Sequence, residues 1–392
     1  MMAILTILFW VSLAVLFYCY VGYAMLIFLL NLFRKDKKPV AGHDARVPVT
    51  LIVTAYNEEA VLPQKIRNTL QIDYPPGLLQ IIFITDGSTD RSADLVREHS
   101  GLLALHLDER KGKYAAIKRA MLRAQHPIVV FSDANTMLNS ECIKKMVDHY
   151  QDNKVGGVAG EKKISRGGKI SAVGAAEGLY WKYESLLKKL DARFNTVTGA
   201  AGELFSIRRS LFKELGDEVV LDDFVMSMQI CLQGYRIAYE PQAFAVELAS
   251  ATLSEEEKRK TRISAGAYQS VGYLKECLNI FKYPVLAFQY ISRRLLRWVF
   301  CPVLLVLVLA INILLYMRGA GEPYNWLLYA QLLLYVMAFA GWKLALTGRP
   351  PGILTIPFYF LFMNYCLAKG FARFIQGKQS VLWEKSLRQA VE

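Results

Sequence analysis

The chain has 392 residues, of which 54% are hydrophobic and 21% are charged, and its mean hydropathy is +0.24. These values exclude both a purely soluble protein and a chain embedded in a membrane throughout, so we expect one soluble domain and several spans. The formal net charge of +13 is compatible with nucleic acid, anionic lipid or anionic substrates. Because membrane proteins concentrate basic residues on their cytoplasmic side, spans account for much of this charge.

The six cysteines lie far apart and form no Cys-x-x-Cys pair. They therefore indicate neither a zinc site nor a disulfide framework. This usage favours a reducing, cytosolic environment for the soluble domain.

Residues 1–33 carry no charged side chain. A spanning helix needs about 20 residues, so this segment predicts one long or tilted transmembrane helix and is too short for two. A basic cluster at residues 34–38 follows directly and places the next domain in the cytoplasm.

Residues 45–262 alternate strand and helix patterns. Apolar runs typical of strands cover residues 49–55, 79–85, 102–107 and 127–131, and amphipathic segments cover 58–71, 90–99, 112–124 and 139–150. This alternation predicts an α/β domain with a mostly parallel sheet and helices on both faces. A long helix over 169–190 and a glycine-containing turn at 199–202 are expected to follow.

The last third of the chain changes character. Residues 263–297 mix aromatic and polar side chains and predict interfacial helices, and uncharged runs at 298–317, 323–342 and 350–368 predict a transmembrane region over 298–375. Four spans would place the tail, residues 376–392, outside, although its basic residues favour the cytoplasm. Because prolines accompany the run at 350–368, we expect that run to be re-entrant or interfacial.

The stretch at 127–135 predicts a buried strand that ends in a polar turn. Residues 127–131 are apolar or β-branched, and Asp133 and Asn135 follow at the carboxyl end. Ligands bind at that end of an open α/β sheet, and a carboxylate with an amide oxygen can hold a divalent cation against substrate phosphates. An Asx turn without a metal is the alternative.

Other acidic residues also follow predicted strands. Asp86 ends the strand at 79–85, where its carboxylate can accept from a ribose hydroxyl or a base imide, unless the segment is a plain strand-to-helix turn. Asp222 and Asp223 are adjacent, so one can orient while the other titrates, and a neighbouring carboxylate raises a pKa toward general-base values. A helix N-terminus enriched in acids is the alternative.

Lys113 opens the helix that precedes the Asp133 strand. A helix start flanked by cations suits a phosphate. Neither GxxxxGK[ST] nor GxGxxG occurs, which excludes a Walker motif and argues against a dinucleotide fold.

Together these motifs resemble family 2 glycosyltransferases, and more narrowly the membrane-integrated members related to cellulose, hyaluronan and poly-N-acetylglucosamine synthases. The resemblance rests on six motifs in the family's order, at residues 53–58, 85–90, 112–113, 132–135, 199–202 and 222–223, and it extends to the flanking spans. Each motif alone is weak, whereas six in order are a strong signal. The resemblance implies a cytosolic domain of the GT-A type.

The resemblance also implies how the donor is held. Tyr56, Glu58 and Asp86 would cradle the nucleotide, which the family suggests is uridine. Lys113 would lie near its diphosphate.

The metal and the catalytic base follow from the same resemblance. Asp133, with Asn135 beside it, would hold a Mg²⁺ or Mn²⁺ ion that bridges the diphosphate. Asp223, next to Asp222, would be the general base that deprotonates the acceptor hydroxyl. Because the family inverts the anomeric centre, an α-linked donor would give a β-glycoside. This chemistry agrees with the residues, since cations neutralise the leaving group while a carboxylate activates the nucleophile.

Two positions depart from the family's pattern. Asn135 stands where a second aspartate is usual, which would weaken metal binding without abolishing it. Processive members carry Gln-x-x-Arg-Trp, whereas this chain has Arg259, Arg262 and Ile263 at the matching positions. Arg262 can still serve the leaving diphosphate as a planar donor, but the missing tryptophan puts processivity in doubt. A basic membrane-proximal face is the alternative.

Aromatic residues on the predicted long helix are candidates for an acceptor groove. Sugars stack on aromatic faces, so Tyr180, Trp181 and Tyr183 could line that groove, although helical core packing is the alternative. Trp383 resembles a tail motif of related synthases and is a candidate for gating the site.

The sequence thus predicts a multi-pass enzyme of the inner membrane, with its catalytic domain in the cytoplasm. It would move a sugar from a UDP-linked donor to a growing polysaccharide or a lipid-linked glycan, in contact with membrane lipids. One alternative is a non-processive transferase that adds one sugar to a polyprenyl-linked acceptor, and another is a non-catalytic nucleotide-binding subunit. No nucleic-acid partner is expected, because basic residues cluster at membrane edges rather than on one recognition face.

Overall fold

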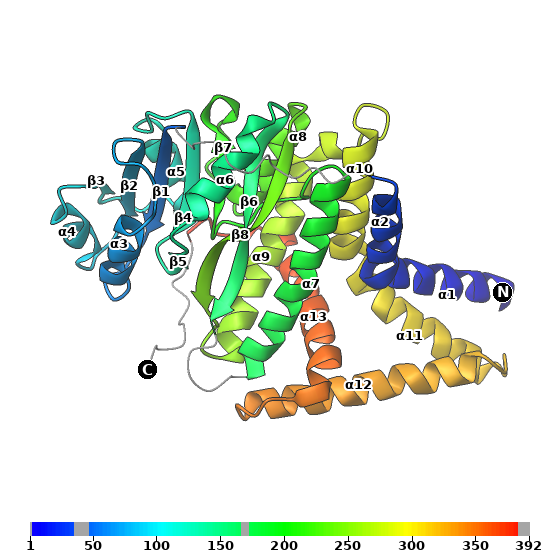
Figure 1. The fold of residues 1–392 in the computed structure, drawn as a ribbon. Helices are drawn as coiled ribbons and strands as arrows, with labels where there is room; N and C mark the ends of the chain where they lie inside the picture. Colours follow the sequence, from blue (N-terminus) through cyan, green and yellow to red (C-terminus); the bar gives the residue numbers. More distant parts are fainter. Residues whose placement is uncertain (1, 35–46, 166–171, 383–392) are drawn as a thin grey trace.

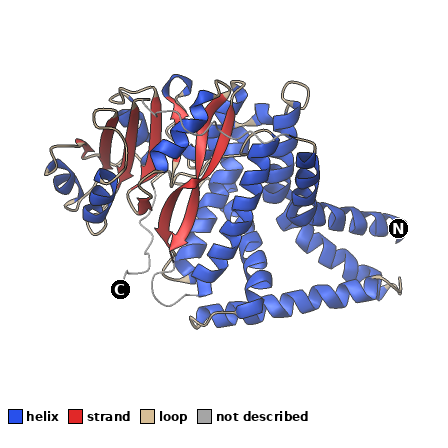
Figure 2. Cartoon of the chain, in the orientation of Figure 1, coloured by secondary structure: helices blue, strands red, loops and turns tan. Residues whose placement is uncertain are grey.

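The computed structural model describes residues 2–34, 47–165 and 172–382, and its centre is an eight-stranded sheet flanked by helices (Figures 1 and 2). The strands lie in the order β3-β2-β1-β4-β7-β6-β8-β5. Their bounds are β1 (Val49–Ala55), β2 (Leu79–Asp86), β3 (Leu103–Leu107), β4 (Ile128–Asp133), β5 (Thr136–Leu138), β6 (Val155–Ser165), β7 (Phe205–Arg208) and β8 (Arg236–Leu248). The sheet is mixed, and the α/β class expected from the sequence is confirmed.

The first half of the sheet is parallel. β1 pairs with β2 on one side and β4 on the other, and β2 pairs with β3. After β3 the chain returns to the other side of β1, where it forms β4, so the strand order reverses between β1 and β4. Such a switch point opens a crevice beyond the carboxyl ends of the two strands, where α/β proteins bind ligands.

The second half of the sheet was not predicted from the sequence. β7 runs antiparallel to both β4 and β6, whereas β6 and β8 are long and parallel to each other. β6 contains glycines that obscure a strand pattern, and the packing explains one of them. A Cβ added at Gly157 would lie 2.8 Å from the Ser206 carbonyl oxygen, so the close approach of β7 requires glycine there.

Helices cover both faces of the sheet and enclose one apolar core on each (Figure 1). The helices of this domain are α3 (Leu62–Leu70), α4 (Ser92–Arg97), α5 (Lys113–Met121), α6 (Cys142–Asp148), α7 (Ala172–Phe194), α8 (Asp222–Leu232) and α9 (Leu253–Tyr273). Within the described residues the predicted strands and helices of 49–150 are all present, with ends shifted by a few residues.

Four helices among the described residues are long and apolar enough to cross a membrane. The first comprises α1 (Met2–Phe17) and α2 (Tyr23–Leu32), joined by a π-helical turn at which the ribbon bends in Figure 1. The second comprises α10 (Pro284–Tyr290), a π-helical segment (Ile291–Phe300) and α11 (Cys301–Met317). α12 (Tyr324–Leu346) and α13 (Thr355–Ile375) are the others.

Two expected boundaries fall inside helices. Residues 262 and 263 lie within α9, and residues 297 and 298 lie within the helix that begins at Pro284. Arg293, Arg294 and Arg297 are consequently part of a long helix and face the protein. Arg293 is 3% exposed, because acidic side chains of α7 provide its partners.

α13 packs on the sheet domain more than the other candidate spans do. It runs across α12 in Figure 1 and contacts α9 along its length. A Cβ added at Gly370 would lie 2.4 Å from the Ser264 side chain, and the Tyr359 hydroxyl donates to Glu256 at 3.0 Å. The structure thus joins α13 to the domain that carries the sheet.

Candidate active site

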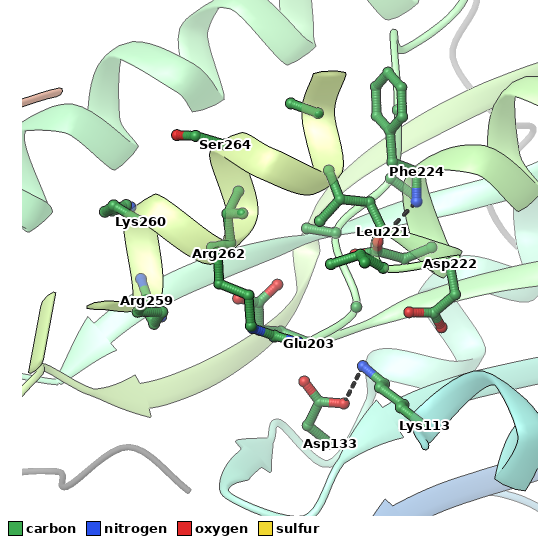
Figure 3. Close-up of a pocket in the computed structure, with 18 of the residues that line it drawn as sticks. Lys113, Asp133, Glu203, Leu221, Asp222, Phe224, Arg259, Lys260, Arg262 and Ser264 are labelled. Carbon is green, nitrogen blue, oxygen red and sulfur yellow. Dashed lines mark hydrogen bonds and ion pairs between the residues drawn. The ribbon is translucent and has the colours of Figure 1, made fainter. Parts of the chain in front are cut away.

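A cavity of about 560 Å³ opens at the carboxyl ends of β1 and β4. Its walls come from the start of α5, the turn at 199–203, the start of α8, and α9, as Figure 3 shows in part. The far wall is built by α7 and by the helix that begins at Pro284. The sheet domain and the candidate spans therefore line one cavity.

An ion pair between Lys113 and Asp133 lies at the floor of this cavity. Their closest nitrogen and oxygen atoms are 2.6 Å apart (Figure 3). Burial raises the pKa of Asp133 in spite of this pair. Burial alone would lower the pKa of Lys113, but the attraction of Asp133, Asp222 and Asp223 raises it. Lys113 thus remains charged and neutralises a carboxylate that faces the ligand space.

Asn135 lies beside Asp133, but its amide nitrogen is directed to Glu247 at 3.4 Å. The described residues contain no group of three His, Cys, Asp or Glu side chains that could hold a metal ion. A cation held here would therefore need oxygens of a bound diphosphate or of water in addition to Asp133. That agrees with the predicted site, in which the substrate completes the coordination shell.

Lys65 supports the Asp133 turn from below and was not identified from the sequence. It is fully buried on α3, and its ammonium donates to the Ser132 hydroxyl at 2.8 Å and to the Thr136 carbonyl at 2.7 Å. Burial lowers its pKa to about 7. The contacts clamp the turn on both sides of Asp133. A lysine at a helix position gives no local signal of such a role.

The two acids at the start of α8 lie across from Lys113. Burial and the neighbouring Asp222 carboxylate raise the pKa of Asp223 to about 7. A Cβ added at Gly202 would lie 2.8 Å from the Lys113 ammonium and 3.1 Å from an Asp223 oxygen. The glycine turn thus lets both groups approach the same point. A carboxylate with a pKa near 7 can act as a general base.

Of the three residues predicted to contact the nucleotide, two line the cavity and one does not. Tyr56 and Glu58 line the cavity, with the Arg110 guanidinium 3.7 Å from the centre of the Tyr56 ring. Asp86 is fully buried outside the cavity. Its carboxylate accepts from the Gly112 backbone at 2.6 Å and from Arg119 at 2.8 Å. In this structure Asp86 fixes the loop before Lys113, and its contact with a nucleotide stays a prediction.

Arg262 and Arg259 differ although both are on α9. Arg262 lines the cavity and forms no ion pair with the residues that the structure describes. Burial lowers the pKa of Arg262. Arg259 instead contacts Glu177 at 2.6 Å and Glu256 at 3.3 Å. Only Arg262 therefore has its guanidinium available for an anionic ligand.

Only some of the aromatic residues predicted for the acceptor groove lie in the cavity. Tyr180 and Trp181 line the cavity, whereas Tyr183 donates to the Tyr20 carbonyl at 2.6 Å and packs outside it. Trp383 lies outside the described residues. Val381 and Leu382, just before it, line the cavity.

The cavity brings the half-buried Lys113–Asp133 pair at the switch point opposite Asp223, a second carboxylate that can accept a proton. This arrangement is suited to transfer of a group from an activated diphosphate donor to a hydroxyl. A solved mannosyltransferase from Pyrobaculum calidifontis, in complex with GDP-mannose and Mn²⁺, has a similar fold, with a TM-score of 0.72. That similarity covers 95% of this chain and 99% of the other at 20% sequence identity, and it shows a shared glycosyltransferase fold of the GT-A type.

Residues 50–216 match the model of glycosyl transferase family 2. The chain thus contains a domain similar to glycosyl transferase family 2, as the sequence motifs predicted. A poly-β-1,6-N-acetyl-D-glucosamine synthase from Staphylococcus aureus is 27% identical over 245 residues, which are 60% of this chain and 58% of that relative. A synthase of the same description from Staphylococcus epidermidis is 24% identical over 302 residues, 73% of this chain and 70% of the relative.

Asp223 must lose its proton before it can act as a base, and its pKa is raised to about 7. We therefore expect kcat/KM to rise with pH through about 7. Asp223→Asn should abolish transfer and retain nucleotide binding, measured on the same preparation. Transfer by that variant near the wild-type rate would contradict the assignment and direct attention to Asp222.

Arg262→Lys keeps the positive charge but loses the planar pair of donors that fits a diphosphate. We expect turnover at saturating donor to fall by about tenfold or more, which corresponds to about 1.4 kcal/mol of transition-state stabilisation. The matched control is Arg209→Lys, an exposed position outside the cavity. Equal rates in wild type and both variants would remove Arg262 from the site.

Proposed function

We propose that this protein is a membrane-integrated, inverting glycosyltransferase that extends a β-linked polysaccharide from a UDP-linked sugar. The observation that carries the proposal is the pairing across one cavity of the Asp133–Lys113 floor with Asp223, whose pKa is raised to about 7. The family 2 domain and the relatives named as poly-β-1,6-N-acetyl-D-glucosamine synthases support a nucleotide sugar and a glycan product. We take N-acetylglucosamine as the first sugar to test.

The residues divide the reaction between them. Lys113 and Arg262 neutralise the negative charge that grows on the departing diphosphate. Asp223 removes the proton of the acceptor hydroxyl as that oxygen attacks the anomeric carbon, and the carbon–oxygen bond to the diphosphate breaks on the opposite side. One displacement of this kind inverts the anomeric centre, so an α-linked donor gives a β-glycoside.

The donor set fits a divalent cation. Asp133 presents a half-buried carboxylate to the cavity, and Asn135 adds an amide oxygen if its side chain rotates. The Mn²⁺ of the Pyrobaculum mannosyltransferase is consistent with such an ion. When bound, Mg²⁺ or Mn²⁺ would supply Lewis-acid stabilisation of the diphosphate. Lys113 would then give up part of its contact with Asp133 and turn to the phosphate oxygens.

A second candidate is the transfer of a single sugar to a polyprenyl-linked acceptor. Arg259 stands where processive relatives carry glutamine, and it is locked to Glu177 and Glu256. Apolar side chains of the candidate spans, such as Trp298 and Leu367, also line the cavity. These features suit a lipid-linked acceptor. A subunit without turnover is disfavoured, because the groups needed for chemistry meet in one cavity.

We further propose that α1, α11 and α12 cross the inner membrane and that α13 lies along its cytoplasmic surface. The support is the packing of α13 on α9 and its direction across α12 (Figure 1). Three crossings put the sheet domain and the basic tail on the same, cytoplasmic side, which agrees with the positive-inside rule.

The donor and the metal are tested together. We expect purified protein in lipid to release UDP from UDP-N-acetylglucosamine only with Mg²⁺ or Mn²⁺, and to stop when the metal is chelated. Asn135→Asp should keep activity and lower the metal concentration that gives half-maximal rate, because a second carboxylate binds a cation more strongly. Full activity in chelator, with no metal detected by elemental analysis, would refute the metal site. No release from any nucleotide sugar would refute the proposed function.

The topology is tested by labelling introduced cysteines in intact cells with a membrane-impermeant maleimide. All six native cysteines are buried, and Arg318, Gln376 and Arg97 are exposed. We expect Arg318→Cys to be labelled from outside and Gln376→Cys only after permeabilisation. Arg97→Cys, on α4, is the cytoplasmic control. Labelling of Gln376→Cys in intact cells would mean that α13 crosses the membrane.

A further inference from the structure

One face of α7 carries a polar stripe that is buried in the protein. Its members follow one another at intervals of four and three residues, the spacing that aligns side chains on one side of a helix. The stripe consists of Glu177, Trp181, Glu184, Lys188 and Asp191. Four of the five are charged, and each charged member is at most 3% exposed. Buried charges at such positions need partners.

The acidic members have strong partners. Glu177 pairs with Arg259 at 2.6 Å, and Arg293 contacts Glu184 at 2.9 Å and Asp191 at 3.1 Å. Burial alone would raise the pKa of Glu184, but the arginines of the neighbouring helix hold it well below its usual range. Three of the four buried charges of the stripe are thus compensated.

Lys188 is the exception. Its ammonium is buried and has no hydrogen-bond partner within the described parts of the chain, although the side chain lines the cavity. The rings of Trp181 and Tyr239 lie 5.4 Å and 6.0 Å from it. Burial lowers the pKa of Lys188, as expected for a cation that lacks a close anion.

The carboxylates near Lys188 are engaged elsewhere. Glu161 accepts from the hydroxyls of Ser185 and Tyr239, and Glu203 accepts from Lys162. Glu203 also acts on the pKa of Asp223, so Lys188 and the predicted base belong to the same stretch of the cavity. The three donors of the ammonium are therefore available to something that enters this cavity.

We propose that Lys188 and Trp181 form the acceptor subsite and bind a neutral sugar unit. The Lys188 ammonium donates to a hydroxyl or amide carbonyl oxygen of that unit, while the indole contacts its apolar edge. This inference rests on the proposed function and specifies its acceptor. The sequence hypothesis placed aromatic residues of this helix in an acceptor groove, and the structure adds the lysine beside them.

The charge of the surroundings favours a neutral sugar over a phosphate. Glu184 and Glu203, each already paired with a cation, line the cavity and act on the pKa of Lys188, so an anion at the ammonium would compete with two carboxylates. The nearest arginines are already bound, since Arg297 contacts Glu184 at 2.8 Å and Arg294 donates to the Thr198 carbonyl at 2.9 Å. A lipid phosphate would have to break these contacts, whereas a sugar needs only the unused donors of Lys188.

The test compares Lys188→Met with Lys189→Met in the full-length protein in lipid. Methionine keeps the length of the side chain and removes its donors, and Lys189 is the exposed neighbour on the same helix. The donor is UDP-N-acetylglucosamine, and the acceptors are a β-1,6-linked N-acetylglucosamine trisaccharide and, separately, a polyprenyl monophosphate. The readouts are the KM for each acceptor, the Kd of the donor and the Tm.

We expect Lys188→Met to raise the KM for the trisaccharide by about tenfold or more, because a hydrogen bond from a charged donor is lost. The donor Kd should stay within about twofold, and Lys189→Met should match wild type. The Tm should not fall, because replacing an unpartnered buried cation by an apolar side chain does not leave a charge without its partner.

Three outcomes would overturn the subsite. An unchanged trisaccharide KM would remove Lys188 from acceptor binding, and a lower Tm would mean that Lys188 is a structural partner of the nearby carboxylates. A loss confined to the polyprenyl monophosphate would replace the sugar subsite with an anion site. Failure of the proposed function is separate, because wild type would then release no UDP with either acceptor.

Discussion

Buried arginine–carboxylate contacts hold the helix that begins at Pro284 to the domain that carries the sheet. Arg293 lies on the helix that continues into α11, and it contacts Glu184 and Asp191 of α7 in an environment that excludes water. Removing one partner of such a buried set costs about 3–5 kcal/mol, because the charge that remains has no compensation. α7 also forms a wall of the cavity. The position of the candidate spans and the shape of the cavity are therefore fixed by the same interaction.

A second connection runs from this helix to the catalytic turn. Arg294 donates to the Thr198 carbonyl, directly before the turn at 199–202. Within that turn Gly202 has no room for a side chain between Lys113 and Asp223. Displacement of the helix would thus reach Lys113 and Asp223, the two groups to which we assign the leaving diphosphate and the acceptor proton. The structure explains physically why a family 2 domain and its apolar helices form one unit.

At the floor of the cavity, the position of the Asp133 carboxylate likewise depends on a cation that neutralises its charge. Asp133 is held by Lys113 in front and by the clamp of Lys65 on the adjacent backbone behind. A diphosphate with its cation would replace the front partner and leave the clamp in place. Arg262, which has no ion pair within the described residues, is positioned to compensate the charge that such a ligand brings.

Sequence alone determined the features that are encoded locally. The four strands and the following helices of residues 49–150 were predictable, because continuous apolar runs and helical periodicity record burial directly. Asp133, Asp223 and Lys113 were candidates from sequence because each follows a strand or opens a helix, where motifs are recognisable, and the structure places all three in one cavity. Tertiary structure decided what depends on distant segments. Asp86 binds the loop before Lys113, Arg259 is held in ion pairs while Arg262 is not, and the second candidate span begins at Pro284. Lys188 is buried with no hydrogen-bond partner among the described residues. A side chain's partners come from elements far away in the chain, so no local pattern could have revealed them.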